Sequence, residues 1–373
     1  MRIAVNTQLL LPGKLEGIGW FSYETLNRIT AAHPEHEFVF IFDRPFDQQF
    51  IFSENIIPYY TYIPSRHPAL WYTRFEHVLP GILKKFNADL FFSPDGWTSL
   101  RAKIRKVTVI HDLNFEQYPE DLPYWTRKYY KHYFPRFARA SDRLITVSNF
   151  SKQDIVSRYH VDPDIIDVAY NGVSGFFHPL AESEIMQVRQ ELTNGENFFV
   201  YIGSLHPRKN IPRLFQAFDQ FCEKCETPWC LVMVGEKMWK FPEMDKVLRE
   251  MKFAHKVKFA GRLSGESANR VVASANALTY VSKFEGFGIP IIEAMCCDVP
   301  VITSNCTSMP EVAGDAALIC DPFSVSSISD AMLQLAENQQ LQQSLVEKGR
   351  GRRNEFSWDK TANAVWDSIC KVL

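Results

Sequence analysis

The chain has 373 residues, more than one ordinary hydrophobic core accommodates, so two domains are expected. Its 46% hydrophobic and 23% charged residues are typical of a globular protein and exclude a disordered one. The net charge of −2 argues against a general nucleic-acid binder. No apolar run is long enough for a membrane-spanning helix, and the N-terminal segment lacks the apolar core of a signal peptide. We therefore expect a cytoplasmic protein.

Short apolar runs alternate with amphipathic segments through the first half of the chain. The strands predicted there are Ile3–Leu9, Glu37–Phe42, Ala88–Phe92, Val107–His111 and Arg143–Val147. The helices predicted there are Trp20–Thr30, Trp71–Phe86, Tyr124–Ala138 and Ser151–Tyr159. This alternation indicates a parallel sheet covered by helices on both faces.

Gly17-Ile-Gly19 follows the first predicted strand and precedes a predicted helix. It resembles the start of a dinucleotide fingerprint, but Tyr23 and Glu24 occupy the region of the third glycine, and no acid is placed for the ribose of NAD. We interpret Gly17–Gly19 as a tight loop that presents backbone N–H groups to a cleft between the domains.

His111 and Asp112 come at the end of a predicted strand. Ligands of open α/β sheets bind outside the carboxyl ends of strands, where an imidazole can donate a hydrogen bond or transfer a proton. A helix-capping Asp112 beside a structural His111 is the alternative. The position favours a functional His111.

The segment Tyr124–Arg139 interleaves basic and aromatic residues at helical spacing. It lies in the stretch Arg66–Arg143, which contains 14 Lys and Arg against 8 Asp and Glu, a local excess of +6. A helix at a membrane surface has this pattern, and so does a helix with a buried aromatic face and a solvated basic face. Contact with an anionic membrane surface is therefore one of two interpretations.

The alternation of strands and helices resumes after Gly172–Pro179, where glycine and proline break the pattern. We predict a first domain over residues 1–174 and a second over 175–356, with a last helix in 357–373 that could pack on either domain. The strands predicted in the second half are Phe198–Ile202, Cys230–Val234, Lys256–Phe259, Ala275–Val281, Val299–Thr303 and Ala316–Ile319; the helices are Ile211–Cys225, Glu243–Met251, Glu266–Ala273, Pro290–Cys296 and Val325–Ala336.

A basic loop, Gly203-Ser-Leu-His-Pro-Arg-Lys-Asn210, follows the first strand of the second half and precedes a helix. Arg208 offers a planar guanidinium and Lys209 a point charge, which together suit a diphosphate. No Asp-x-Asp pair stands at a strand end to hold Mg²⁺ or Mn²⁺. We therefore expect a phosphate site without a metal. The lone Cys222-Glu-Lys-Cys225 pattern lacks a second pair for zinc, so its thiols are expected to be ordinary ones.

The most informative segment is Glu285-Gly-Phe-Gly-Ile-Pro-Ile-Ile-Glu293. Gly286 and Gly288 allow the backbone to approach a ligand closely, and Pro290 suits the first turn of a helix. The start of that helix presents free N–H groups to a phosphate or sugar oxygen. Glu285 and Glu293 can then bind hydroxyls of one ligand from two directions.

Together these segments resemble glycosyltransferase family 4. The likeness covers nearly the whole chain, and the Glu285…Glu293 pair is its most specific mark. The resemblance implies the GT-B fold, in which two doubly wound Rossmann-like domains face a central cleft. The other segments that carry the resemblance are Gly17–Gly19, His111, Val147–Ser151, Asn171–Val173, the loop from Gly203 to Lys209, and Gly261–Leu263.

The resemblance also implies roles for individual residues. Arg208 and Lys209 should hold the diphosphate of a nucleotide sugar, Glu293 its ribose, Glu285 its sugar, and His111 the sugar hydroxyls near the reacting carbon. The remaining donor-binding residues it implies are Gly17, Gly19, Ser204, Arg262, Leu263, Phe287, Gly288 and Ile289. Ser204 and Asn210 depart from the arginine and glycine that many members have there, which makes the role of Arg208 less certain than that of Lys209.

The nearest likeness is to bacterial mannosyltransferases of surface-polysaccharide assembly. This implies transfer of a hexose from GDP-mannose to a glycan or lipid-linked acceptor, with retention of configuration and with no cofactor. Catalytic roles are expected for His111, Lys209 and Glu285. A UDP-sugar donor, a sugar-nucleotide epimerase and a non-catalytic sugar-nucleotide-binding scaffold are the alternatives. The acceptor cannot be inferred from the sequence.

Overall fold

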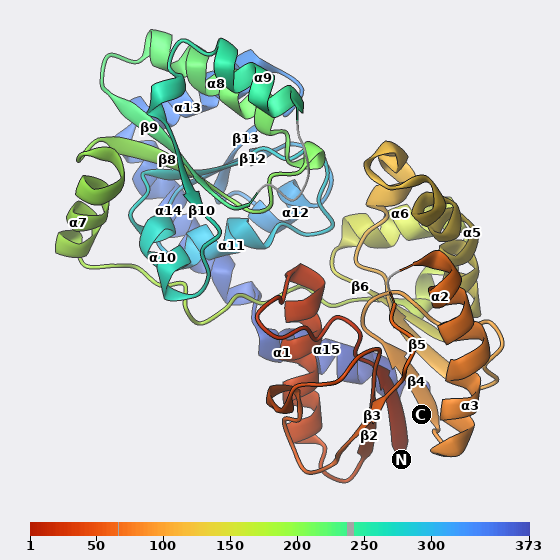
Figure 1. Ribbon diagram of the computed structural model, residues 1–373. Helices are drawn as coiled ribbons and strands as arrows, with labels where there is room; N and C mark the ends of the chain where they lie inside the picture. Colours follow the sequence, from red (N-terminus) through yellow and green to blue (C-terminus); the bar gives the residue numbers. More distant parts are fainter. Residues whose placement is uncertain (66, 237–241) are drawn as a thin grey trace. The chain divides into compact units, whose positions relative to one another are not determined.

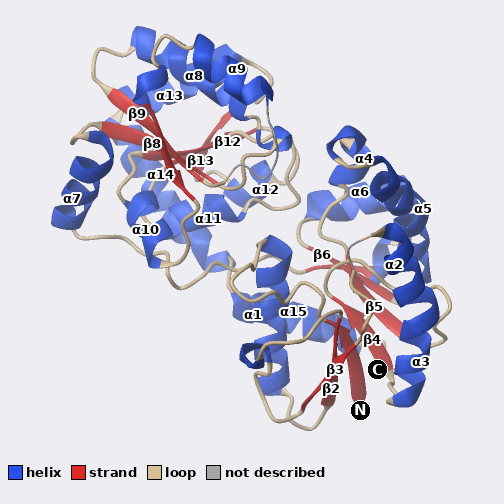
Figure 2. Cartoon of the chain, in the orientation of Figure 1, coloured by secondary structure: helices blue, strands red, loops and turns tan. Residues whose placement is uncertain are grey.

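The computed structural model describes residues 1–65, 67–236 and 242–373 (Figure 1). The chain forms two compact units. The first contains Met1–Gly172 together with Ser357–Leu373, and the second contains Val173–Phe356. Each unit is a parallel sheet between layers of helices, as Figure 2 shows. The predicted α/β class with two doubly wound sheets is confirmed.

The sheet of the first unit has the strand order β3-β2-β1-β4-β5-β6-β7, and all neighbouring strands are parallel. The order reverses between β1 and β4, which places a topological switch point at the carboxyl ends of these two strands. The strands are β1 (Arg2–Asn6), β2 (Glu37–Phe42), β3 (Ile56–Tyr60), β4 (Leu90–Ser93), β5 (Arg105–Val109), β6 (Arg143–Thr146) and β7 (Ile166–Val168).

The helices of the first unit cover both faces of its sheet (Figure 1). They are α1 (Gly17–Ala32), α2 (Pro68–Tyr72), α3 (Leu79–Lys85), α4 (Asn114–Gln117), α5 (Tyr124–Ala140), α6 (Asn149–Tyr159) and α15 (Trp358–Cys370). The prediction of a single regular α-helix over Trp71–Phe86 is wrong. This segment contains the end of α2, a π-helical segment over Thr73–Val78, and α3, whose first turn contains Pro80. A proline lacks the N–H that would continue the preceding hydrogen-bond ladder.

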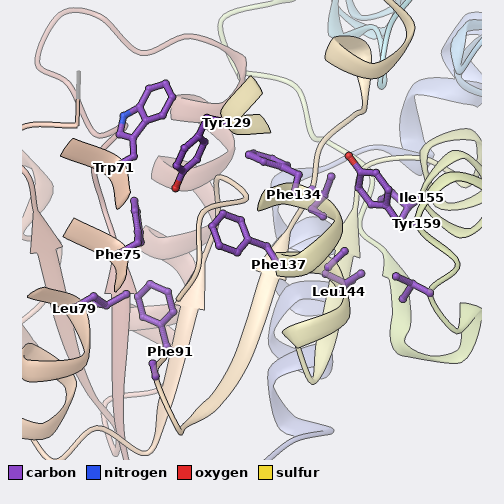
Figure 3. Packing of buried hydrophobic residues seen from close by; sticks show 14 of the residues in the cluster. Trp71, Phe75, Leu79, Phe91, Tyr129, Phe134, Phe137, Leu144, Ile155 and Tyr159 are labelled. Atoms are coloured by element: carbon purple, nitrogen blue, oxygen red, sulfur yellow. The ribbon is translucent and has the colours of Figure 1, made fainter. Parts of the chain in front are cut away.

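The core on one face of the first sheet is rich in aromatic side chains (Figure 3). Trp71 and Phe75, from the segment around α2, meet Phe137 of α5 and Phe91 of β4. The T-shaped pair of Trp71 and Tyr129 has its ring centroids 5.2 Å apart. The buried face of α5 is thus aromatic, while its N-terminal residues Tyr124 and Trp125 remain exposed.

The sheet of the second unit has the strand order β10-β9-β8-β11-β12-β13, again with parallel neighbours. Its switch point lies between β8 and β11. The strands are β8 (Asn197–Ile202), β9 (Trp229–Val234), β10 (Val257–Gly261), β11 (Ala277–Tyr280), β12 (Val301–Ser304) and β13 (Ala317–Cys320). The helices are α7 (Glu182–Thr193), α8 (Ile211–Lys224), α9 (Pro242–Glu250), α10 (Glu266–Ala273), α11 (Ile289–Cys296), α12 (Met309–Ala313), α13 (Val325–Glu337) and α14 (Gln339–Arg352).

The C-terminal helix α15 belongs to the first unit. Trp366 stacks on His33 at a centroid distance of 3.8 Å, and Asp359 accepts a hydrogen bond from Arg28. A Cβ atom on Gly172 would lie 2.2 Å from the backbone nitrogen of Trp358, so the segment that leaves the first unit lies directly against the segment that returns to it. Among the helices of the described residues, none is both long and apolar enough to cross a membrane. All eight cysteines are free thiols.

Candidate functional site

The carboxyl ends of β8 and β11 carry most of the residues predicted for a nucleotide sugar. The loop after β8 contains Ser204, Arg208 and Lys209, and the loop after β11 contains Glu285, Phe287 and Gly288. These two strands are neighbours at the switch point of the second sheet. Because open α/β sheets bind ligands at this place, the topology brings both predicted loops to one site.

The loop after β8 approaches its neighbouring strand very closely. A Cβ on Gly235, just beyond β9, would lie 1.9 Å from the carbonyl oxygen of Gly203. The hydroxyl of Tyr201 donates to the carbonyl of Ser204 at 2.9 Å. Asn210 has a φ of +63° directly before α8, a left-handed conformation that Asn tolerates better than most residues. This explains why Asn can stand at a position where glycine is common in the resembled family.

Lys209 and Glu285 form a buried ion pair. The Lys209 Nζ lies 2.6 Å from the Oε1 of Glu285 and 2.6 Å from the hydroxyl oxygen of Tyr280. Arg208 donates to the Oε2 of the same carboxylate at 3.0 Å. Lys209 is 7% exposed and Glu285 5%. One carboxylate therefore fixes the positions of both cations that the sequence predicts for a diphosphate.

The pKa of Glu285 reflects this environment. Burial acts to raise the pKa, but the charges of Lys209 and Arg208 outweigh burial and lower it to about 2. Glu285 is thus ionised at neutral pH. A carboxylate has more lone pairs than these two contacts use, so it can still accept hydrogen bonds from a ligand.

The segment before α12 stabilises the turn from Glu285 to Gly288 through hydrogen bonds. The Ser308 Oγ lies 2.9 Å from the carbonyl oxygens of both Glu285 and Phe287. Gly288 has a φ of +104° and stands immediately before α11, which begins at Ile289 with Pro290 in its first turn. The predicted strand–turn–helix corner is confirmed. At the start of α11, Pro290 has no N–H and the N–H of Ile291 donates to the carbonyl of Gly288 at 3.0 Å, so the N–H of Ile289 is the group that suits an anionic oxygen.

Glu293 lies on α11 and is half-buried. Burial raises the pKa of its carboxyl group to about 8. No hydrogen bond or ion pair to this carboxyl is found among the described residues. Glu285 and Glu293 therefore differ in charge at neutral pH, because only Glu285 has basic neighbours. Arg262 and Leu263, the other predicted donor residues of this unit, follow β10, where Arg262 is exposed and Leu263 half-buried.

His111 lies in the first unit, two residues beyond β5. Its Nε2 is 2.8 Å from the carbonyl oxygen of Pro94, and the ring of Phe21 meets it edge-on at 4.8 Å. Burial lowers the pKa of His111, so the imidazole is neutral at neutral pH. The strand predicted to include His111 in fact ends at Val109.

Gly17 and Gly19 do not form the predicted loop. They are in the first turn of α1, which begins at Gly17. A Cβ on Gly19 would lie 3.1 Å from the carbonyl oxygen of Leu9, so the glycine allows the preceding loop to pack against the helix. Free N–H groups are still present, because the first turn of any helix provides them.

Two contributors to this site were missed by the sequence analysis. Tyr280 contacts Lys209 both through its hydroxyl and through its ring, whose centroid is 4.9 Å from the Nζ. Ser308 holds the Glu285 turn. Tyr280 is the last residue of β11, so attention to strand ends could have found it; nothing local in the sequence marks Ser308. Within residues 1–65, 67–236 and 242–373, no three His, Cys, Asp or Glu side chains form a group suited to a metal ion.

Comparison with known proteins identifies the family. Residues 16–174 match the model of Glycosyltransferase Family 4, and residues 182–352 match that of Glycosyl transferases group 1. Together the two matches cover most of the chain, which therefore belongs to glycosyltransferase family 4. O-antigen chain mannosyltransferase B of Escherichia coli is 27% identical over 92% of this chain and 93% of its own length. O-antigen chain mannosyltransferase RfbU of Salmonella typhimurium is 26% identical over 74% of each chain.

The solved structures show the same fold. HepE of Anabaena, determined in complex with UDP and glucose, superimposes with a TM-score of 0.77 over all of both chains at 16% sequence identity. WaaG, a glycosyltransferase of lipopolysaccharide biosynthesis, gives a TM-score of 0.75 at 16% identity, over 97% of this chain and 98% of its own. The predicted GT-B fold and the predicted glycosyltransferase activity are confirmed by these comparisons.

Proposed function

We propose that this glycosyltransferase moves mannose from GDP-mannose to a glycan or lipid-linked acceptor in the assembly of a surface polysaccharide. The observation that carries the proposal is the cluster of buried Lys209 and Glu285 with half-buried Arg208 at the switch point of the second unit. It concentrates positive charge where a diphosphate would bind. The mannosyl specificity rests on the relatives, two of which are named as O-antigen chain mannosyltransferases.

The roles follow from the contacts. Lys209 and Arg208 stabilise the negative charge that develops on the leaving diphosphate, and Glu285 orients both cations and accepts a hydrogen bond from the sugar. Backbone N–H groups at Phe287, Gly288 and Ile289 bind phosphate oxygens. The acceptor hydroxyl attacks the anomeric carbon from the face of the departing diphosphate. The bond to the diphosphate breaks as the new glycosidic bond forms, and the hydroxyl proton passes to the diphosphate, so configuration is retained.

A panel of nucleotide sugars tests the donor. We expect GDP-mannose to give the largest increase in melting temperature and the fastest release of nucleotide, compared with UDP-glucose, UDP-galactose and UDP-N-acetylglucosamine. A preference for a UDP sugar would show that the donor is not GDP-mannose, but the protein would still be a glycosyltransferase. Binding without any release, in the presence of mannose-terminated acceptors, would instead favour a non-catalytic sugar-nucleotide-binding scaffold.

Transfer should persist in the presence of EDTA. Arg208 and Lys209 supply the positive charge that a divalent cation supplies in metal-dependent enzymes, and they are held by Glu285 before any ligand binds. The initial rate with GDP-mannose is measured with chelator and again after Mg²⁺ or Mn²⁺ is added back. Complete loss of transfer that either ion restores would contradict the proposal.

The affinity for GDP-mannose should rise with pH through the titration of Glu293. Ribose hydroxyls donate to the ionised carboxylate, while burial holds the pKa of the free group at about 8. If only the protein with ionised Glu293 binds the donor, the measured affinity rises on the order of fivefold between pH 7 and pH 8. Calorimetric titration measures this. Glu293→Gln removes the titrating group and should bind more weakly with no such slope; an equal slope in this variant would remove Glu293 from the binding site.

The first unit should bind anionic membrane surfaces through the start of α5. Tyr124 and Trp125 are 51% and 64% exposed, and the Nζ of Lys128 lies 4.8 Å and 5.7 Å from their rings. They line an open depression of about 680 Å³ together with Arg127 and Lys131. Aromatic and basic groups in one exposed patch suit lipid headgroups and hence a lipid-linked acceptor at the cytoplasmic face. Arg66, the first residue of the basic stretch, lies outside the described residues.

Flotation with liposomes tests the membrane contact. Changing Arg127, Lys128 and Lys131 to Glu should weaken binding to anionic liposomes on the order of a hundredfold, since each base contributes about 1 kcal/mol near such a surface. Changing Lys224, Lys246 and Lys252 of the second unit to Glu alters the net charge equally and should have little effect. Equal losses in both variants, or equal binding of the wild type to neutral liposomes, would argue against this surface.

A further inference from the structure

A buried polar network lies at the switch point of the first unit. Asp95 follows β4 by two residues and is 4% exposed. Its carboxylate accepts hydrogen bonds from the Asn6 Nδ2 at 2.7 Å and 2.9 Å, from the Gln8 Nε2 at 2.7 Å and from the Ser93 Oγ at 2.9 Å. Asn6 is the last residue of β1 and Ser93 the last of β4. The network thus joins the two strands between which the sheet order reverses.

Arg74 fixes the direction of these hydrogen bonds. It is also buried, and it donates to the Gln8 Oε1 at 2.7 Å, to the Asn6 Oδ1 at 3.2 Å and to the carbonyl oxygen of Ile41 at 3.1 Å. Because Arg74 can only donate, it turns both amide oxygens toward itself and both amide nitrogens toward Asp95. Asp95 is therefore the acceptor for both amide nitrogens. Burial raises the pKa of its carboxyl group only to about 6, so the group is mostly ionised at neutral pH.

Asp95 lies next to one carbonyl group. The carbonyl of Pro94 belongs to the planar peptide unit that joins Pro94 to Asp95, and the hydrogen-bonded side chain of Asp95 anchors the Cα atom at one end of that unit. The next residue, Gly96, has a φ of +90°, and a Cβ there would lie 2.9 Å from the Cε1 of Phe134. The turn after Pro94 therefore packs closely against Phe134, and the Pro94 carbonyl oxygen lies 2.8 Å from the Nε2 of His111.

This contact determines where His111 carries its proton. A carbonyl oxygen can only accept, so the Nε2 of His111 must be protonated. In the neutral imidazole the Nδ1 is then an acceptor, and no hydrogen bond to it is found among the described residues. Asp112, next in the chain, accepts from the backbone N–H of Asn114.

We propose that Asp95 is a positioning residue that, through the Pro94 carbonyl, holds His111 in the tautomer with its proton on Nε2 and its Nδ1 free to accept. Resting on the proposed function, the ligand consequence is that His111 accepts a hydrogen bond from a sugar hydroxyl and does not donate one. The sequence had suggested a donor or a proton shuttle at this position. The network determines the tautomer whichever nucleotide sugar is the substrate.

Nitrogen NMR of histidine tests the proposal without any substrate. The full-length protein is labelled with ¹⁵N-histidine, and long-range ¹⁵N–¹H correlation spectra distinguish protonated from unprotonated ring nitrogens. The signals of His111 are those missing from His111→Gln. We expect the tautomer with Nε2 protonated to predominate in the wild type, and the averaged nitrogen shifts give the ratio of the two tautomers. A wild-type His111 with its proton mainly on Nδ1, or with equal populations of the two tautomers, would overturn the proposal even if no variant folds.

Two matched variants then test Asp95. Asp95→Asn places an amide nitrogen against the amides of Asn6 and Gln8, and should reduce the ratio of the two tautomers about fivefold or more, the effect of losing about one hydrogen bond. Asp167→Asn is the control. Asp167 is a half-buried aspartate of β7 in the same unit, but its partners are Arg143 and Lys371, outside the Asp95 network. An unchanged ratio in a folded Asp95→Asn, or equal changes in both variants, would refute the positioning role. Failure to bind any nucleotide sugar would refute the proposed function and leave this result intact.

Discussion

Replacing Lys209 by Met should lower kcat for mannosyl transfer at least about a hundredfold, because removing one preorganised charge from a developing oxyanion costs about 2.7–4 kcal/mol. The side chain is buried against Tyr280 and Glu285, so its ammonium group is positioned before the donor binds. Met retains most of the volume, and Arg208 still pairs with Glu285. We therefore expect the second unit to remain folded. Initial rates over a range of GDP-mannose concentrations give kcat and KM separately.

Lys224→Met is the matched control for this prediction. Lys224 is also a lysine of the second unit, but it is exposed at the end of α8 and pairs with Asp330 at the surface. Its replacement should leave kcat within about twofold, since exposed ion pairs contribute little. A Lys209→Met variant with unchanged kcat and a raised KM would show that Lys209 binds the ground state and the transition state equally, contrary to the proposed mechanism.

Replacing Glu285 by Ala should abolish activity and also destabilise the second unit by about 3–5 kcal/mol. The substitution leaves the buried Lys209 ammonium without its counter-ion, and breaking a buried pair from one side has roughly this cost. Urea denaturation of the variant and the wild type measures the difference. The double variant Lys209→Met, Glu285→Gln should regain much of the stability and none of the activity, because it removes both charges together.

The Lys209–Glu285 ion pair also predicts that the stability of the fold depends on pH. The pKa of Glu285 is about 2 in the folded protein, below its ordinary value of 4.5. A lowered folded-state pKa means that the ionised carboxylate stabilises the fold fully above pH 4.5 and progressively less as the pH falls toward 2. The stability advantage of the wild type over Glu285→Gln should therefore shrink between pH 5 and about pH 3. A constant difference over this range would show that Glu285 titrates normally.

The strands and helices with strong periodicity could be predicted from the sequence, and the others could not. Strand β3 contains Pro58, which argues against a strand in sequence, yet β3 is an edge strand, where proline is tolerated. Helix α14 buries only Leu345 and Gly349, so its sequence has no apolar stripe to reveal it. The same holds for α7, whose buried residues are Val188 and Thr193.

The site could be predicted as two loops but not as a set of contacts. Parallel topology places the loops after β8 and β11 together, and the strand-end rule therefore located Lys209 and Glu285. Their direct ion pair depends on side-chain directions across two strands, which spacing does not give. The role of Asp95 could not be predicted, because no second aspartate accompanies it at its strand end and its partners Asn6 and Gln8 lie 89 and 87 residues away in sequence.

The stereochemistry of the product distinguishes retaining from inverting mannosyl transfer. GDP-α-mannose is incubated with the enzyme and a series of mannose-terminated glycans and lipid-linked sugars, and the new glycosidic bond is assigned by NMR from the coupling between its anomeric carbon and hydrogen. We expect the wild type to form an α-mannoside and Lys209→Met to form none. A β-mannoside, or a product formed equally fast by Lys209→Met, would contradict retaining mannosyl transfer at the Lys209–Glu285 site.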